Sequence, residues 1–394
     1  MSEPPCPFSE TDLQQWKLIA DFRRRLEAFA KQRRHHPAWQ DKRRRLQQFD
    51  HLSLVLFTLV NPVIASLRGA AQASGLLRLR QEVCSQATSK SALSEAQHLL
   101  DPTLLEGLIA SLSAEIAGPA PKDPRSPWQV WLARDSSIFP ATHRMFWAQY
   151  GAGKPGRHNH AVRFHVSFHL WDEKPACVAV TPGKVCERKA WRQQLETGAT
   201  YVGDRYFAED YKLFGELQAL GCWFVLRLRD EAVVQVLEEN AITDEDRKAG
   251  IISDQWVQLG STKRYRTGRL RLITLRKHSG TVMRLVSNME PGQMSCREIQ
   301  TLYRRRWQIE CYFRWLKCLL GCRHWLAESP EGVSTQLYLA VIAGLLLQIV
   351  LGRRPNKRLW ERLQFYLMGW ATAEELMLAV QADLEKDAGK KTAK

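Results

Sequence analysis

The chain has 394 residues, 45% of them hydrophobic, with 57 Lys and Arg against 41 Asp and Glu and a formal net charge of +16. This length predicts two or three domains, or one large domain with insertions, and the hydrophobic fraction supports a sizeable core. The positive excess favours a polyanionic partner, most commonly nucleic acid. The nine Cys residues include no CxxC pair, which argues against a disulfide framework and favours a reducing compartment.

Residues 1–45 are predicted to form a basic helical arm. Between Lys17 and Arg45 there are eleven Lys or Arg and three acids, with aromatic residues among them. Such a helix can lie along a phosphate backbone, although a solvated helix or a basic disordered tail has the same composition. Residues 46–116 show helical periodicity, and we expect a small helical domain there that carries no chemistry.

The hydrophobic period changes after a proline-rich linker at 117–127. Strand-like and helical segments then alternate, and two of the strands end in an acid, at Asp135 and Asp204. The predicted strands are 128–135, 161–170, 176–181, 199–204 and 222–229, and the predicted helices are 187–196 and 206–221. Helices between the later strands require crossovers, so this order predicts an α/β fold with a mixed sheet that contains parallel pairs.

Residues 230–290 interrupt the alternation with four strand-like segments, and we expect an inserted β-rich subdomain there. The basic stretch 263–272 within it is either a DNA-facing edge or a solvent-exposed hairpin, and the sequence leaves both open. Residues 353–394 are predicted to form a helical tail.

The longest apolar run, from Leu337 to Leu351, has fifteen residues. A helix that spans a bilayer needs about 20 apolar residues, so we expect a buried helix instead. The N-terminus shows no apolar signal region. These features predict a soluble, cytoplasmic protein without a membrane partner.

The most informative stretch is YRRRWQIECYFRWLK, from Tyr303 to Lys317, which lacks Pro and Gly and is rich in helix-forming residues. On an ideal helix with Tyr303 at zero, Arg306 falls at about 300°, Glu310 at about 340° and Lys317 at about 320°. A phenol, a guanidinium, a carboxylate and an ammonium group therefore share one narrow face beside an apolar stripe. A solvated ion pair between Arg306 and Glu310 is the simpler explanation unless other carboxylates reach Glu310.

Asp135 and Asp204 are the carboxylates that could reach Glu310. Sites in open sheets with parallel strands gather at the carboxyl ends of the strands, where both aspartates are predicted to lie. Three carboxylates held close together require cations, and their hard oxygen atoms suit Mg²⁺ or Mn²⁺. Two such ions can stabilise the attacking and leaving oxygens of a phosphoryl displacement. Each acid taken alone is explained equally well as a cap, a turn residue or a surface charge.

The spacing Tyr-x2-Arg-x3-Glu-x6-Lys, at Tyr303, Arg306, Glu310 and Lys317, resembles the signature of bacterial insertion-sequence transposases of the DDE class. Within that class, the spacing is similar to the signature of the family numbered four, which is known as the Tyr-Arg-Glu-Lys group. The segments TPGKVCERKA, VGDRYF and ALGCWFVLRLR also look like the second-Asp region of that family. The resemblance covers most of residues 128–350, with weaker similarity over 49–110.

The resemblance implies a ribonuclease-H-like mixed-sheet core in two parts, residues 128–229 and 291–352, with the β-rich insertion 230–290 between them. It implies that Asp135, Asp204 and Glu310 are catalytic and bind the metal, Mg²⁺ or Mn²⁺, as two ions. Tyr303, Arg306 and Lys317 would contact DNA phosphates.

The family's activity is cleavage of double-stranded DNA at the ends of the element and transfer of the freed strand to target DNA, with paired ends that suggest a homodimer on DNA. Two other readings remain open. One is a related metal-dependent nuclease or a catalytically idle, sequence-specific DNA-binding descendant, and the other is a structural protein with a basic surface.

Overall fold

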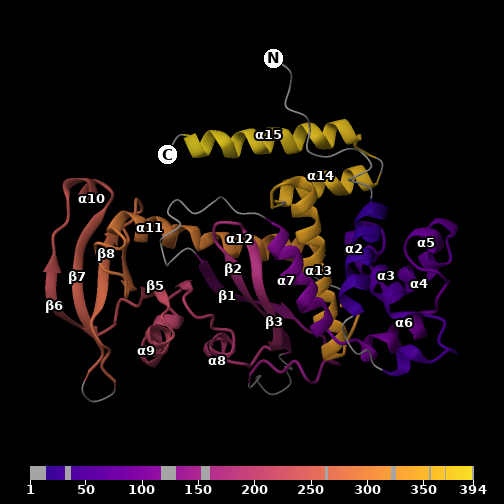
Figure 1. Cartoon of the computed structure of the whole chain (residues 1–394), viewed down its shortest axis with the longest axis horizontal. Coiled ribbons are helices and arrows are strands. Elements are labelled where there is room, and N and C mark those ends of the chain that lie inside the picture. The colour runs from indigo at the N-terminus through magenta and orange to yellow at the C-terminus, as the bar shows by residue number, and fades with distance from the viewer. Residues whose placement is uncertain are drawn as a thin grey trace.

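A mixed sheet runs through the part of the chain that the computed structural model describes (Figure 1). The described residues are 15–31, 37–116, 130–151, 160–261, 265–320, 325–354, 356–368 and 370–392. The strands are β1 (Trp131–Pro140), β2 (Ala161–His169), β3 (Lys174–Pro182), β4 (Thr200–Gly203), β5 (Trp223–Leu228), β6 (Val234–Asn240), β7 (Ile251–Leu259), β8 (Leu270–Arg276) and β9 (Val282–Ser287). Their order in the sheet is β3-β2-β1-β4-β5-β9-β8-β7-β6. Strands β1, β4 and β5 are mutually parallel and the other neighbours are antiparallel, which confirms the predicted α/β fold with parallel pairs.

The insertion extends the central sheet. The four predicted strand segments form β6 to β9, but β9 pairs with β5 in the antiparallel sense, from Val225 opposite Ser287 to Leu228 opposite Arg284. These strands continue the core sheet at one end of the molecule (Figure 1), so the β-rich insertion is joined to the core through a strand ladder. A short helix, α10 (Asp244–Lys248), lies between β6 and β7 and was not predicted.

Helices cover both faces of the sheet (Figure 1). One face carries α7 (Thr103–Glu115), α11 (Cys296–Arg305), α12 (Trp307–Leu319) and α13 (Pro330–Leu351), and the other carries α8 (Glu187–Arg192) and α9 (Tyr211–Ala219), preceded by the 3-10 helix η3 (Phe207–Glu209). Side chains alternate between the two cores. Ala133 and Val202 pack in the core with α12 and α13, whereas Leu132 and Tyr201 pack in the core with α8 and α9. This alternation decides which face each functional side chain takes.

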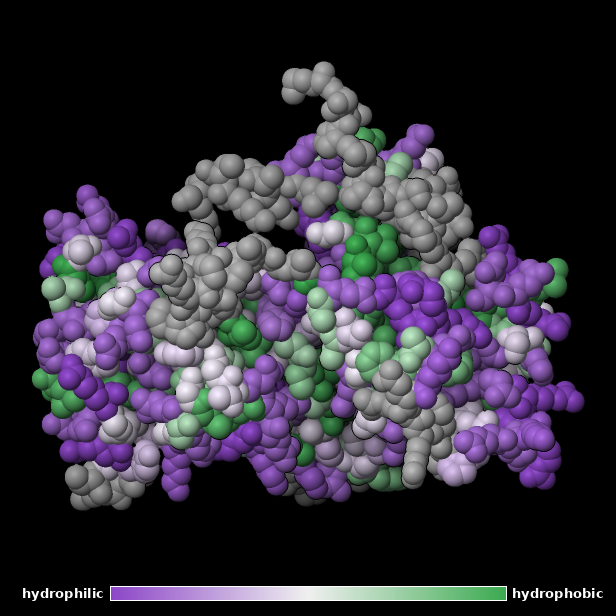
Figure 2. All heavy atoms as spheres, viewed as in Figure 1, coloured by the Kyte–Doolittle hydropathy of each residue, from purple (hydrophilic) through white to green (hydrophobic). Residues whose placement is uncertain are grey.

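The predicted buried helix is α13, which is longer than its apolar run. It has 22 residues because the more polar turns after Pro330 are also helical, with the Ser329 hydroxyl accepting from the Gly332 amide at 3.1 Å. By length and composition α13 could cross a membrane, yet 83% of its most apolar window is buried inside the protein. The face shown in Figure 2 is largely hydrophilic over the insertion and the N-terminal helices. Burial of α13 thus confirms the predicted buried helix.

The predicted N-terminal arm is partly built into the fold. The helices in this region are α2 (Gln15–Ala30), η1 (Pro37–Gln40), α3 (Gln48–Val60), α4 (Leu67–Ser74), α5 (Leu77–Glu82), α6 (Lys90–Ala96) and η2 (Gln97–Leu99). Helix α2 buries Ile19, Phe22 and Leu26 completely, and Arg23 donates to the Asp50 carboxylate at 2.8 Å. Helix α2 packs with α3 and α7, so it lies against the helices of residues 46–116, and the boundary expected at residue 45 stays a prediction. Residues 1–14 and 32–36 lie outside the described residues, and contact of the arm with DNA stays a prediction.

The predicted helical tail is confirmed as α14 (Lys357–Leu367) and α15 (Ala373–Thr392), which pack against each other (Figure 1). The Asn356 side chain caps α14 by accepting from the Leu359 amide at 2.8 Å, and its amide group donates to Asp383 on α15 at 2.7 Å. This pair of helices lies on the α12 and α13 side of the sheet.

Candidate active site

Asp135 and Asp204 lie on neighbouring parallel strands at the same level of the sheet. The ladder between β1 and β4 pairs Ala133 with Val202; Asp135 is two residues beyond Ala133, and Asp204 is the residue that follows β4. Alternation along β1 directs Asp135 to the same face as Ala133, toward α12. The prediction that β1 ends at Asp135 is wrong, because β2 pairs with β1 as far as Pro140 and holds the strand extended.

Glu310 is brought to this face by α11 and α12. Ser295 and Glu298 form a capping box that starts α11, and a single residue with helical torsion angles, Arg306, separates α11 from α12. The prediction of one continuous helix is therefore wrong at that residue. Helix α12 packs through buried Ile309 and Tyr312, and the Tyr312 ring lies 5.1 Å from that of Phe168 on β2.

Arg306 joins two of the three predicted acids. One guanidinium nitrogen lies 3.8 Å from the carboxylate of Asp135, and the other donates to the carboxylate of Glu310 at 2.6 Å. The Tyr303 ring lies 5.7 Å from the same guanidinium. Burial raises the pKa values of Asp135 and Tyr303, and the negative charge of Asp204, at the end of the neighbouring strand β4, is a smaller cause in the same direction. The structure thus brings Asp135, Tyr303 and Glu310 around Arg306, with Asp204 at the end of the strand beside β1.

Lys317 lies apart from this group. It follows Glu310 by seven residues, which corresponds to about 10 Å along a helix axis. Its ammonium nitrogen lies 5.3 Å from the ring centre of Phe139, near the end of β1. Lys317 therefore extends the positive charge of α12 toward the end of β1.

Residues that the sequence did not single out hold the loop after Asp204. The Tyr206 amide donates to the Asp204 carboxylate at 2.9 Å, and the Arg188 side chain donates to the Tyr206 carbonyl at 2.9 Å and stacks on its ring. Arg188 also pairs with Glu209, which pairs in turn with Arg229 at the end of β5. The segment CERKA contains Arg188, but nothing in its spacing indicated this role.

The electrostatics of the cluster are governed by Asp135. The pKa of its carboxyl group is raised to about 7, chiefly by burial and to a smaller extent by the nearby charge of Asp204. The hydrogen bond from the Ser136 amide and the charge of Arg306 act in the opposite direction. Such a group binds either a proton or a cation. In this structure the Arg306 guanidinium is the cation that faces it.

The donor chemistry of the cluster fits a hard divalent cation. Asp135, Asp204 and Glu310 offer carboxylate oxygens, the ligand type that Mg²⁺ and Mn²⁺ favour, and Arg306 already stands between two of them as a positive charge. Among the described residues, however, no three His, Cys, Asp or Glu side chains are spaced to hold a metal ion.

Asp135→Asn is expected to stabilise the metal-free protein at pH 8 and to leave its stability unchanged at pH 4. Because the folded pKa is raised to about 7 from an ordinary value of 3.8, the stabilisation from the bound proton is complete below pH 4. This stabilisation is lost as the pH rises through 7. A neutral amide at position 135 avoids the loss, which amounts to about 2–4 kcal/mol in the free energy of unfolding. Chemical denaturation in EDTA across this pH range measures it.

The matched control for this experiment is Glu361→Gln, at an exposed carboxylate on α14 that pairs with Lys357. Its stability profile should follow that of the wild type at every pH. A difference between Asp135→Asn and the wild type that does not grow from pH 4 to pH 8 would contradict the assigned environment of Asp135.

Residues 130–346 match the family described as the transposase DDE domain. The chain is 28% identical over 218 residues to the putative transposase y4zB of Sinorhizobium fredii, which covers 55% of this chain and 59% of the relative. It is 24% identical over 248 residues to the probable transposase for insertion sequence element IS5377 of Geobacillus stearothermophilus, covering 62% and 63% of the two chains. The chain thus spans about three fifths of the length of these two relatives.

A further relative is the putative transposase for insertion sequence element IS4SA of Synechocystis, which is 22% identical over 284 residues, 70% of this chain and 76% of the relative. Among solved structures, the piggyBac transposase synaptic complex with hairpin DNA is similar with a TM-score of 0.42 and 12% identity, over 84% of this chain and 71% of that chain. The family match extends over more than half of the sequence and includes Asp135, Asp204 and Glu310. The chain therefore belongs to the family of the transposase DDE domain.

Proposed function

We propose that this protein is a transposase that cuts double-stranded DNA at the ends of an insertion sequence and joins the freed strand to target DNA. The observation that supports this most strongly is the arrangement of Asp135, Arg306 and Glu310 on β1 and the Glu310 helix, with Asp204 at the end of the neighbouring strand β4. Membership of the transposase DDE domain family gives the reaction class. The strand order β3-β2-β1-β4-β5, followed by the helix of Glu310, supports a ribonuclease-H-like core.

Asp135, Asp204 and Glu310 would hold the divalent metal, as one or two ions of Mg²⁺ or Mn²⁺. When bound, such ions activate water and stabilise the attacking and leaving oxygens of a phosphodiester. The protein's part is to fix the carboxylates in place: Asp135 through the β1 ladders and Asp204 through the Tyr206 amide. Packing of α12 on β1 and α13 fixes Glu310.

Tyr303, Arg306 and Lys317 would bind phosphate oxygens next to the cut. Arg306 changes partner in this proposal, because a guanidinium released by Glu310 and Asp135 can bind a phosphate with two hydrogen bonds. Capture of DNA would then free the carboxylates for the metal. Two ends must be processed together, so we further propose a homodimer on DNA that acts in the cytoplasm, and membership of the Tyr-Arg-Glu-Lys signature group.

The proposed function is tested by incubating the purified full-length protein with DNA that carries the inverted repeats flanking its gene, in Mn²⁺ or Mg²⁺. Strand cleavage at the repeat ends, and joining of those ends to a target duplex, are expected in both metals. Sequence-specific binding without cleavage in either metal would favour the catalytically idle DNA-binding descendant. Cleavage that ignores the repeat ends would favour the related nuclease, and weak, sequence-blind binding would favour a structural protein with a basic surface.

Lys317→Ala is expected to weaken binding of end DNA without changing its sequence preference. A lysine that contacts phosphate contributes a sequence-independent term, so the slope of log K against log salt should fall by about 1. Binding titrations in Ca²⁺ at several salt concentrations measure this slope.

The control for Lys317 is Lys357→Ala, at an exposed lysine on α14 that pairs with Glu361. Its binding constant and its salt slope should both equal those of the wild type. An unchanged slope for Lys317→Ala would remove Lys317 from the proposed DNA contact.

A further inference from the structure

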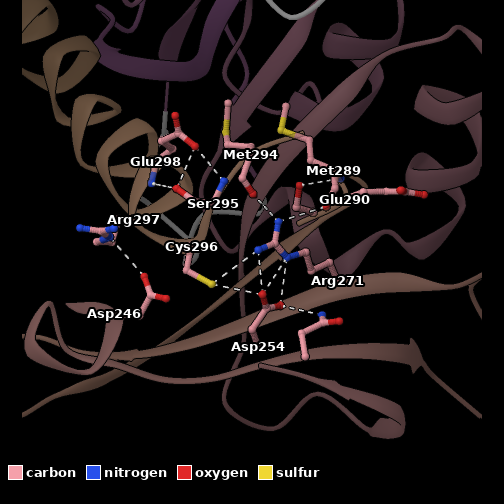
Figure 3. Close-up of polar contacts among 12 residues, drawn as sticks. Asp246, Asp254, Arg271, Met289, Glu290, Met294, Ser295, Cys296, Arg297 and Glu298 are labelled. Atoms are coloured by element: carbon pink, nitrogen blue, oxygen red, sulfur yellow. Dashed lines mark hydrogen bonds and ion pairs between the residues drawn. The ribbon is translucent and has the colours of Figure 1, made fainter. Parts of the chain in front are cut away.

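A fully buried ion pair joins two strands of the insertion. Arg271 on β8 and Asp254 on β7 are 1% and 2% exposed. The guanidinium binds the carboxylate through two nitrogens, with Nε at 2.9 and 3.2 Å from the two oxygens and Nη2 at 2.7 Å (Figure 3). The Asn240 side chain of β6 also donates to the Asp254 carboxylate, at 3.1 Å.

The remaining donors of Arg271 leave the insertion and reach the start of the helix pair that carries Glu310. Nη1 donates to the backbone carbonyl of Met294 at 2.5 Å and to that of Met289 at 3.4 Å, both in the segment between β9 and α11 (Figure 3). The thiol of Cys296, the first residue of α11, donates to the Asp254 carboxylate at 3.2 Å. The buried pair thus fixes the entry of the chain into α11.

Two further contacts attach the insertion to α11 itself. The Gln300 side chain donates to the Ala249 carbonyl at 3.1 Å, and the Arg297 guanidinium lies 3.3 Å from the Asp246 carboxylate, which belongs to α10. Helix α11 leads through Arg306 directly into α12 and Glu310. These contacts lie at and near the start of α11, where a small shift of the backbone would change the direction of both α11 and α12.

Stability alone does not account for this cluster. A buried ion pair is weak evidence for stabilisation, because removing two charges from water offsets much of their attraction, and an apolar pair of similar volume often serves as well. What an apolar pair cannot replace is the set of hydrogen bonds to the Met289 and Met294 carbonyls, which hold backbone in one place. Groups that orient metal-binding side chains change metal affinity, and here the restraint would act on Glu310 through the backbone of α11 and α12.

We propose that Asp254, Arg271 and Cys296 are positioning residues, through which the insertion sets Glu310 in place opposite Asp135 and Asp204. The proposal rests on the proposed function, because it assigns to the insertion a part in that same site. It predicts that the cluster governs how readily the carboxylates take up the divalent cation, separately from how stable the fold is.

The test compares Arg271→Met with the double variant Asp254→Leu and Arg271→Met. The single variant leaves the Asp254 carboxylate buried without its partner, so its thermal midpoint should fall sharply, whereas the double variant should regain most of the wild-type midpoint. Both variants should require about 10-fold more Mn²⁺ for half-maximal cleavage of end DNA. In both, backbone amides of α11 and the first turns of α12 should exchange hydrogen faster than in the wild type.

The matched control is Arg269→Met on the same strand, at a side chain that is 54% exposed and pairs with Glu238 at the surface. It should leave the thermal midpoint, the Mn²⁺ requirement and the exchange of α11 unchanged. If the double variant regains the wild-type Mn²⁺ requirement and the wild-type exchange of α11 together with its stability, the cluster has only a structural role and the proposal is overturned.

Failure of the proposed function gives a different result. In that case the wild-type protein itself leaves end DNA uncut in Mn²⁺ and Mg²⁺. Hydrogen exchange then still decides whether the cluster restrains α11, because that measurement needs neither DNA nor metal, and unchanged exchange in the double variant would overturn the restraint as well.

Discussion

Glu310→Gln should abolish strand cleavage by this protein while leaving its binding to end DNA intact. The substitution keeps the shape of the side chain and removes the negative charge that the divalent cation requires. A loss on the order of 10³-fold in the cleavage rate, or about 4 kcal/mol of transition-state stabilisation, is expected. Single-turnover cleavage in saturating Mn²⁺, with gel-shift titration of the same DNA in Ca²⁺, measures the two properties separately.

Glu361→Gln, which also replaces a glutamate in an ion pair on a helix, is the control for Glu310 and should cleave as the wild type does. Glu310 differs from it because its partner, Arg306, also faces Asp135. Retained cleavage in Glu310→Gln would reject the assignment of Glu310, and joint loss of cleavage and DNA binding would point to misfolding of α12 instead.

Gly344→Ala is expected to destabilise the protein, although alanine is the better helix former. A Cβ at Gly344 on α13 would lie 2.3 Å from the far edge of the Trp315 ring on α12, and Trp315 is buried. The two helices must separate or the indole must leave its rotamer, which costs about 1–3 kcal/mol. Thermal denaturation should show the loss, and cleavage should fall as well, because α12 carries Glu310.

The matched control is Gly215→Ala on α9, where the nearest atom to an added Cβ is the Tyr265 hydroxyl at 3.7 Å. Here only helix propensity acts, and the variant should gain up to about 1 kcal/mol. Adding Trp315→Leu to Gly344→Ala should restore part of the lost stability. If both glycine variants raise the thermal midpoint, α12 and α13 are not packed as closely as the structure has them.

Local patterns in the sequence predicted on which elements the candidate site residues lie. Asp204 follows a short strand with a clear apolar pattern, and the wheel of the 303–317 segment put Arg306 and Glu310 on one face, where the structure has them 2.6 Å apart. These are short-range properties, since they depend on helix and strand periods of a few residues. The helical tail at 353–394 was predicted for the same reason.

Long-range pairing was beyond the reach of such patterns. Nothing local to β9 specifies that it pairs with β5, so the continuation of the sheet into the insertion was missed. The extension of β1 beyond Asp135 has the same origin, because β2 supplies its partner. Asp254 and Arg271 also gave no signal, since they are 17 residues apart on separate strands and become a pair only through the β7–β8 ladder.

The N-terminal arm shows how composition can hide a pattern. Its arginines suggested a surface helix, yet Ile19, Phe22, Leu26 and Ala30 recur at helical spacing and are all buried. The charge count was correct as a description of the exposed face of α2. The charge count did not reveal that α2 packs against the core, because one apolar stripe is enough to bury one face of a helix.

The ladder between β5 and β9 has a mechanical consequence. Four residue pairs, from Val225–Ser287 to Leu228–Arg284, join the insertion to β5, the strand next to β4 and Asp204. A hinge there would break backbone hydrogen bonds inside a sheet, so the insertion cannot swing over DNA as a lid does. Under the proposed function, closure around DNA would therefore have to move the helices and connecting loops that flank this sheet.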